Sequence, residues 1–388
     1  MVVYWIMFVY TLTVSFLFEF LNKNMGVKSL RKKNNNAAQC TLGILGAVTS
    51  FLLIIIVPGI RGYVADTTAY IMAFESETRT LVDIPSLFMD LLNAKGPLWG
   101  ALQIIVKNYI SDNVTVFFMI IAVFQGFAVA KTFCTYTENF TFSSYLFITG
   151  YTFFWMLNGA RQFTAVCIVL LASKYLCNKQ FGKYVLFVVI AFFFHSSSIM
   201  CAVVYFIAQG EPFNKRVIWT IILALLCVLF IDSFTGILNS SLEDTQYSVS
   251  GQDYTVESGM SPLVTLMNAV PVILVLWQRK RVFSIERPRY IDVFINVACV
   301  NIGICLIANF TSGITFGRLP VYFIMYNYIL IPWIIEKAFV GMDKIIIRFM
   351  CIMLYMVYFL YQGYLTGSGS YQSLYGDFLY NNFSIKLF

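Results

Sequence analysis

Long apolar runs separated by short polar stretches constrain this chain more than any other feature. A helix needs about 20 consecutive apolar residues to cross a bilayer, and the 388 residues contain about ten such runs. Hydrophobic residues make up 59% of the chain and charged residues only 12%, a balance that a soluble domain cannot bury. The pattern excludes disordered, fibrous, coiled-coil and nucleic-acid-binding proteins, and it predicts a polytopic membrane protein.

The runs also indicate the kind of secondary structure. Backbone amides inside hydrocarbon need partners within the protein, so only helices and closed barrels cross a membrane. Barrel strands would alternate apolar and polar residues in units of about ten, whereas these runs are continuous. We therefore predict an all-α fold, a polytopic transmembrane helical bundle of about 10–14 helices that include short re-entrant ones. Nothing in the sequence divides the chain, so residues 1–388 are expected to form a single membrane domain.

Basic residues predict the orientation, because Lys and Arg are enriched in short cytoplasmic loops. They gather in two places, Lys23, Lys28, Arg31, Lys32 and Lys33 after the first run and Arg279, Lys280, Arg281, Arg287 and Arg289 later in the chain. Both loops are expected inside, which puts both termini outside.

Counting the crossings then divides the chain into spans and outside segments. The expected spans are 2–21, 40–60, 114–133, 141–159, 162–178, 217–238, 261–278, 290–310, 319–336 and 345–362. The expected outside segments are 61–112, with short helices, 239–260, and the tail 363–388. Residues 184–208 are too few for two full spans, so we expect a hairpin of two short helices that turns near His195.

This topology collects polar residues on the outer side. They are Arg61, Asp66, Tyr70, Arg161, Gln162 and Arg318, with His195 on the hairpin that can open to the same side. Arginines at the outer ends of helices break the inside preference of basic residues, and polar residues at the membrane are functional candidates. Each guanidinium offers a planar fork of donors that can grip a phosphate through two hydrogen bonds. The cluster therefore predicts an anion-binding site.

Simpler interpretations of these residues remain open. An arginine at a helix end can be an interfacial anchor whose charged head reaches water. Asp66 precedes an apolar stretch and could cap its helix, and His195 could be a structural residue at a turn. With one His, no CxxC pair and no closely spaced outside carboxylates, the chain predicts neither a metal nor another cofactor.

Four motifs in order suggest a family. They are Arg61 with Asp66, Thr67 and Tyr70; Asn158 to Gln162; Phe194 to Ile199 around His195; and Arg318 with Tyr322. Together they resemble the EpsG-like branch of Wzy-type bacterial polysaccharide polymerases over nearly the whole chain.

The resemblance implies a GT-C-like glycosyltransferase of the cytoplasmic membrane. Such an enzyme joins oligosaccharide repeat units carried on undecaprenyl pyrophosphate at the outer face, so donor, acceptor and membrane lipids would be its partners, and a chain-length regulator is a further candidate. The expected catalytic residues are His195, Asp66, Arg161 and Arg318, and the expected substrate-binding residues are Arg61, Tyr70, Gln162 and Tyr322. His195 is preferred to Asp66 as the base, because an imidazole titrates near neutral pH.

Two other classes of protein compete with this interpretation. A membrane O-acyltransferase would also use a lone His, but its acyl donor arrives from inside, whereas the predicted site faces outside. A lipid-linked oligosaccharide flippase would use cations in a cavity, but the chain lacks the repeated halves that transporters often have.

Overall fold

The computed structural model describes residues 1–24, 37–62, 64, 66–89, 96–231, 259–311 and 316–365. Every regular element in these ranges is a helix, so the all-α, polytopic bundle is confirmed. Most of the predicted loop 239–260, nearly all of the predicted tail 363–388 and the basic residues of 25–36 lie outside the described residues. The described residues divide into two compact units: those of 1–89, 96–167 and 352–365 form unit 1, and those of 168–351 form unit 2.

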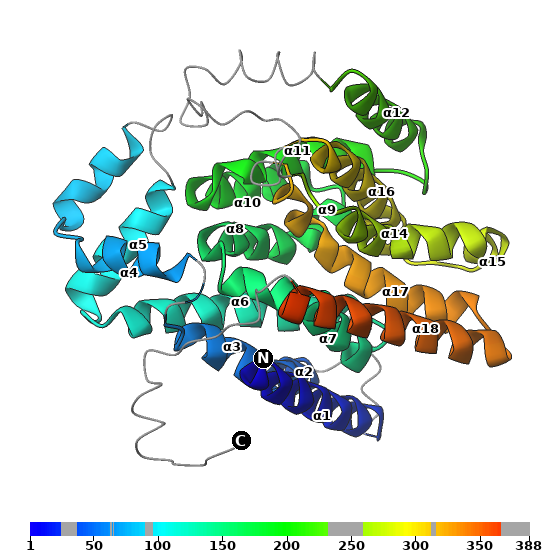
Figure 1. The fold of residues 1–388 in the computed structure, drawn as a ribbon, viewed down its shortest axis with the longest axis horizontal. Helices are drawn as coiled ribbons and strands as arrows, with labels where there is room; N and C mark the ends of the chain where they lie inside the picture. Colours follow the sequence, from blue (N-terminus) through cyan, green and yellow to red (C-terminus); the bar gives the residue numbers. More distant parts are fainter. Residues whose placement is uncertain are drawn as a thin grey trace. The chain divides into compact units, whose positions relative to one another are not determined.

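Unit 1 holds the first helices of the chain and the last one. Its elements are α1 (Val2–Asn24), α2 (Ala37–Ser50), α3 (Leu52–Gly59), α4 (Thr67–Glu75), η1 (Leu81–Phe88), α5 (Pro97–Tyr109), α6 (Val114–Tyr136), α7 (Phe140–Thr149), η2 (Thr152–Met156) and the π-helical turn η6 (Tyr361–Leu365). It also includes the start of α8 (Ala160–Leu171) and the end of α18 (Gly341–Leu360). Within it α1 packs on α2 and α7, and α3 lies against α6 (Figure 1).

Unit 2 is built around α16. Its elements are the end of α8, α9 (Ser173–Cys177), α10 (Phe181–Phe194), η3 (Ser196–Ile199), α11 (Met200–Ala208), α12 (Lys215–Leu229), α14 (Pro262–Trp277), α15 (Arg279–Ser284), α16 (Arg289–Asn309), η5 (Leu319–Tyr322), α17 (Ile324–Ala338) and the start of α18. Helices α11, α12, α14 and α17 all pack on α16, which is buried along most of its length.

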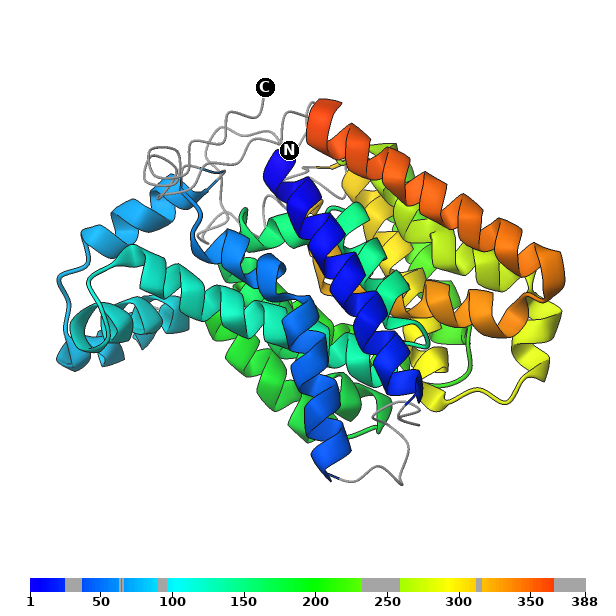
Figure 2. The ribbon, with the colours of Figure 1, turned by 90° about the horizontal axis from the view of Figure 1, so that it is seen from below.

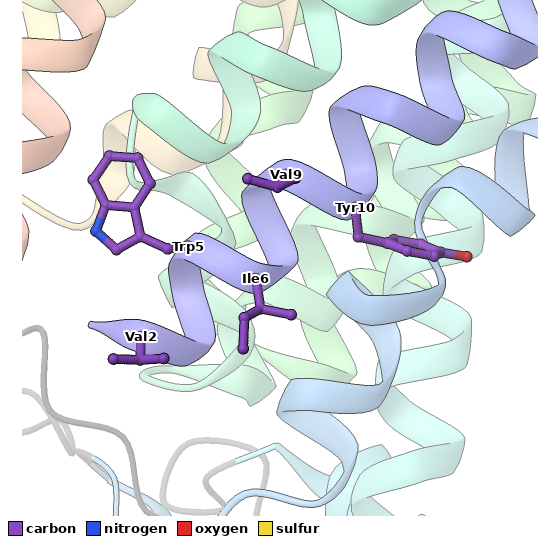
Figure 3. Close-up of a pocket in the computed structure, with 5 residues that line it drawn as sticks. All are labelled: Val2, Trp5, Ile6, Val9 and Tyr10. Carbon is purple, nitrogen blue, oxygen red and sulfur yellow. The ribbon is translucent and has the colours of Figure 1, made fainter. Parts of the chain in front are cut away.

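Four helices of the described residues are long and apolar enough to cross a membrane. They are Val2–Asn22, Val114–Tyr136, Arg289–Asn309 and Gly341–Tyr364, and several shorter apolar helices accompany them. Apolar side chains also face outward: Val2, Ile6 and Val9 of α1 are each more than half exposed. With Trp5 and Tyr10 they line a hollow of about 500 Å³ on α1, shown in Figure 3. Such a surface suits lipid and would be unfavourable in water.

Two glycines bring α3 and α6 into close contact. A methyl group added at Gly59 would overlap the side chain of Met119, and one added at Gly126 would overlap that of Ile55. Small residues of this kind let helices in membranes approach closely, since van der Waals packing is the main force between them there. The pair of helices is seen from a second side in Figure 2.

Two expected spans are interrupted. The span predicted over 141–159 consists of α7 and η2, separated by Tyr151, which has a left-handed backbone conformation with φ of 58°. Its ring packs against Phe153, Phe154 and Phe359 at centroid distances of 5.3, 5.2 and 5.9 Å. That packing offsets the roughly 1–2 kcal/mol of the left-handed conformation. The span predicted over 162–178 is likewise split into α8 and α9.

Helices α10 and α11 run antiparallel where the hairpin was predicted. Phe181 near the start of α10 packs on Phe206 near the end of α11, with 4.8 Å between ring centres. Tyr184 and Tyr205 meet one turn further in, at 5.3 Å. The turn between the two helices is His195 and η3. The depth of this hairpin in the membrane and the side to which it opens stay predictions.

Candidate functional site

Arg61 follows α3 and is buried, with 2% of its surface exposed. Its guanidinium carbon lies 4.1 Å from the ring centre of Phe118 and 5.8 Å from that of Tyr70. One guanidinium nitrogen donates a hydrogen bond to the carbonyl oxygen of Met156 in η2. A guanidinium over aromatic rings gains cation–π attraction. Because this head is enclosed, Arg61 is not an interfacial anchor that reaches for water.

An aromatic cluster holds α4, and with it Tyr70, against α5 and α6. Tyr70 packs on Trp99 of α5, with ring centres 5.3 Å apart, and Trp99 packs on Phe117 of α6 at 5.2 Å. Phe74 stacks on the same Phe117, also at 5.2 Å. Lys107 of α5 donates hydrogen bonds to the carbonyl oxygens of Glu75, the last residue of α4, and of Glu77. The short helices expected in 61–112 therefore form one packed layer within unit 1.

The candidate residues of unit 1 lie near the hydroxyl of Tyr70. This hydroxyl lies near the backbone of Arg161 and within electrostatic reach of the side chains of Arg161, Asp66 and Arg61. Burial raises the pKa of the Tyr70 phenol, and the Asp66 carboxylate acts in the same direction, whereas the two arginines oppose the shift. The phenol therefore stays protonated at neutral pH and can donate its proton in a hydrogen bond. We call Arg61, Asp66, Tyr70 and Arg161 the Tyr70 group.

Asp66 stands directly before α4, in the position of a capping residue. Its side chain nevertheless makes no capping hydrogen bond to that helix. The alternative that Asp66 serves as the cap of α4 is therefore wrong. Its carboxylate lies half-buried beside Tyr70 instead.

Arg161 and Gln162 lie in the first turn of α8. The preceding Gly159 has φ of 80°, a left-handed conformation that glycine adopts without strain, and this lets the chain turn sharply into the helix. Arg161 is half-buried, whereas Gln162 is buried with 2% exposed. The structure thus brings Arg161 into the Tyr70 group and directs Gln162 into the protein.

In unit 2, hydrogen bonds join His195 to Tyr322. Nδ1 of His195 lies 2.7 Å from Oγ of Ser197, and that oxygen lies 3.1 Å from the hydroxyl of Tyr322. His195 is in extended conformation between α10 and η3, which turns its ring toward Ser197. Tyr322 is buried at the end of η5. We call His195, Ser197 and Tyr322 the His195 group.

Arg318 directly precedes η5, the short helix that ends at Tyr322. It is half-buried. Ser197 is the member of the His195 group that the sequence did not single out. The available signal was its place two residues after the lone His, a spacing at which a side chain can reach back across a turn.

Metal ligands do not gather in the part of the chain that the structure describes. No three side chains of His, Cys, Asp or Glu come together there in a way that could hold an ion. The charged groups that do gather around Tyr70 are two guanidiniums and one carboxylate. Their chemistry suits an anion or a polar hydroxyl compound.

The comparison with protein families decides the assignment. The family model described as EpsG family matches residues 44–375. This chain belongs to the EpsG family. The match covers both the Tyr70 group and the His195 group, and it confirms the resemblance that the four motifs suggested. No curated protein and no solved structure matches the chain. The EpsG family is associated with polysaccharide polymerases, so the chain is a membrane protein of polysaccharide biosynthesis.

Proposed function

We propose that this EpsG-family protein is a Wzy-type polymerase. It joins oligosaccharide repeat units carried on undecaprenyl pyrophosphate, at the outer face of the bacterial cytoplasmic membrane and without a metal ion. The observation that carries the proposal is the Tyr70 group, in which the charges of Arg161 and Arg61 act on one protonated phenol. Such a set of donors matches a pyrophosphate.

The reaction moves the growing glycan from one lipid to another. The anomeric carbon of the donor loses its bond to the pyrophosphate oxygen, which leaves with the electron pair, and forms a bond to a hydroxyl oxygen of the acceptor sugar. The proton of that hydroxyl passes to a base. The leaving pyrophosphate gains negative charge as the bond breaks, so cations aimed at it stabilise the transition state, by about 10²–10³ in rate for one such donor.

Within the Tyr70 group the roles follow from exposure. Arg161 is half-buried and grips the pyrophosphate directly, and the Tyr70 hydroxyl donates a further hydrogen bond. Arg61 is enclosed by Phe118 and Met156, so it contributes mainly through its charge. Asp66 orients a sugar hydroxyl, and Gln162 is a further contact to the sugar or the phosphate. Arg318, outside the Tyr70 group, is proposed as a third cation for the leaving group.

His195 is the proposed base. When its Nδ1–H donates to Ser197, Nε2 carries the lone pair that accepts a proton. Tyr322 holds Ser197 in turn and so keeps the imidazole in one orientation. A general base of this kind contributes about 10²–10⁴ in rate.

The test is polymerisation by purified protein in lipid vesicles, with a lipid-linked repeat unit as substrate. Arg161→Lys and Arg318→Lys should each lose at least about 90% of the rate while remaining folded, because Lys keeps the charge but lacks the fork. Arg279→Lys is the control, since that exposed side chain contacts only the ring of Phe283 in the described residues. Normal polymer from both variants would contradict the proposal.

Cells that lack the protein separate the competing functions. Mass analysis of their lipid-linked glycans should find single repeat units at the outer face if the protein is a polymerase. Units trapped at the inner face would indicate a flippase instead. Full-length polymer lacking acyl groups would indicate an acyltransferase.

A further inference from the structure

Gln125 is a polar residue in the interior of α6, one of the helices long enough to cross a membrane. None of its surface is exposed. Its side-chain nitrogen donates hydrogen bonds to the carbonyl oxygen of Ala160, at 2.9 Å, and to Oγ1 of Thr164, at 3.0 Å. Thr164 donates to the same carbonyl oxygen at 2.9 Å. The amide of Gln125 therefore connects α6 to the first turn of α8.

The carbonyl that Gln125 holds belongs to the peptide bond that precedes Arg161. A peptide unit is planar, so the oxygen of Ala160 and the N–H of Arg161 are opposite ends of one rigid plate. The oxygen accepts from Gln125 and Thr164, so this end of the plate is fixed. The hydroxyl of Tyr70 lies near the backbone of Arg161 at the other end. The direction in which the Arg161 side chain leaves the backbone depends on this plate.

The buried side-chain amide of Gln125 lowers the stability of the fold relative to an apolar side chain. Among the described residues its oxygen Oε1 has no hydrogen-bond partner, and a buried polar group in that state costs about 1–3 kcal/mol. An apolar side chain of the same length would avoid that cost and pack equally well. A polar residue retained inside a membrane helix points to a task other than holding the fold.

We propose that Gln125 is a positioning residue that sets the direction of Arg161 by holding the carbonyl oxygen of Ala160. The inference rests on the proposed role of Arg161 at the pyrophosphate. Gln125 does not touch the substrate; it acts through the peptide plate and the first turn of α8. A misplacement of a binding group by about 1 Å can lower a rate about 10²-fold, so the loss of this contact should be visible in catalysis.

The test is a double-mutant cycle in the vesicle assay. Gln125→Met keeps the length of the side chain and removes its hydrogen bonds, and it should lower kcat about 10–100-fold with the substrate KM little changed. Thr132→Val is the matched control: Thr132 is buried in the same helix, and among the described residues its side chain bonds only within that helix, to Ala128. This variant should keep its rate. Rates are divided by the amount of monodisperse folded protein.

The decisive measurement combines Gln125→Met with Arg161→Lys. If Gln125 acts through Arg161, the double variant is no slower than Arg161→Lys alone, because the group to be positioned is already gone. If Gln125 only supports the fold, its loss multiplies with that of Arg161→Lys and the inference is overturned. Wild-type activity of Gln125→Met overturns it as well. Wild-type activity of Arg161→Lys would instead refute the proposed role of Arg161 at the pyrophosphate, which keeps the two failures distinct.

Discussion

Replacing Tyr70 by Phe removes a single oxygen atom from the Tyr70 group. The ring stays against Trp99, so the aromatic cluster that holds α4 is preserved. Two interactions are lost, the polar interaction with the backbone of Arg161 and the proposed bond from the phenol to the pyrophosphate. The first is at most a neutral hydrogen bond, so its loss should lower the free energy of unfolding by no more than about 0.5–1.5 kcal/mol.

The second lost interaction determines the effect on activity. A hydrogen bond to a charged group contributes about 1.5–3 kcal/mol, which corresponds to a factor of about 10–100 in kcat/KM. Tyr70→Phe should show this loss in the vesicle assay while the thermal unfolding of the variant changes little. Tyr109→Phe in the neighbouring helix is the control, since its side chain is 61% exposed.

The pH dependence of this loss tests the electrostatics. Burial raises the pKa of the Tyr70 phenol above its usual value near 10, so the hydroxyl keeps its proton through neutral and mildly alkaline pH. The ratio of wild-type to Tyr70→Phe activity should therefore be constant between about pH 6 and 9 and fall only as the phenol ionises above that range. A ratio that collapses near pH 8, or a variant as active as wild type, would refute the reasoning.

Three further predictions address the remaining assignments. Single cysteines introduced in a cysteine-free background should react with an impermeant outside reagent at position 318 and stay protected at position 280; the reverse pattern would overturn the orientation. Ser197→Ala should slow polymerisation about tenfold or more and shift the acid side of its pH–rate profile. Ser197→Thr, which keeps the hydroxyl, and Ser196→Ala should both match wild type. Equal pH–rate profiles for all three variants would remove Ser197 from the mechanism. Wild-type activity should persist in excess EDTA; activity lost in chelator and restored by Mg²⁺ would contradict the metal-free reaction. His195→Ala should be inactive, and an active variant would move the base to Asp66.

The sequence predicts the helices because their cause is local. A run of apolar residues has to become a helix in hydrocarbon whatever surrounds it, and Pro58, Pro271 and Pro332 lie within helices as they can in membranes. The break at Tyr151 could not be predicted in this way. Its left-handed conformation is held partly by Phe359 and Tyr4, which are far away in the sequence, and the residue itself carries no sign of a turn.

The candidate site likewise has parts that the sequence predicts and parts that depend on contacts between distant residues. Arg61, Asp66 and Tyr70 are close in the sequence, and the topology alone suggested that Arg161 joins them. The hydrogen bonds that organise the two groups could not be predicted, because Ser197 and Tyr322 are separated by 125 residues and Gln125 and Ala160 by 35. A lone Gln inside the otherwise apolar run 116–130 was the one available signal for Gln125.

The close contact of α3 with α6 has a consequence for motion. Gly59, which contacts Met119, lies two residues before Arg61. Gly126, which contacts Ile55, lies next to Gln125. Each of the two close contacts between the helices is therefore near one of these residues. Neither helix can slide along the other without driving Met119 or Ile55 into backbone atoms. The Arg61 guanidinium and the Gln125 amide are therefore expected to move as one body. Their backbone amides should exchange with deuterium slowly and together, as a single cooperative unit of unit 1.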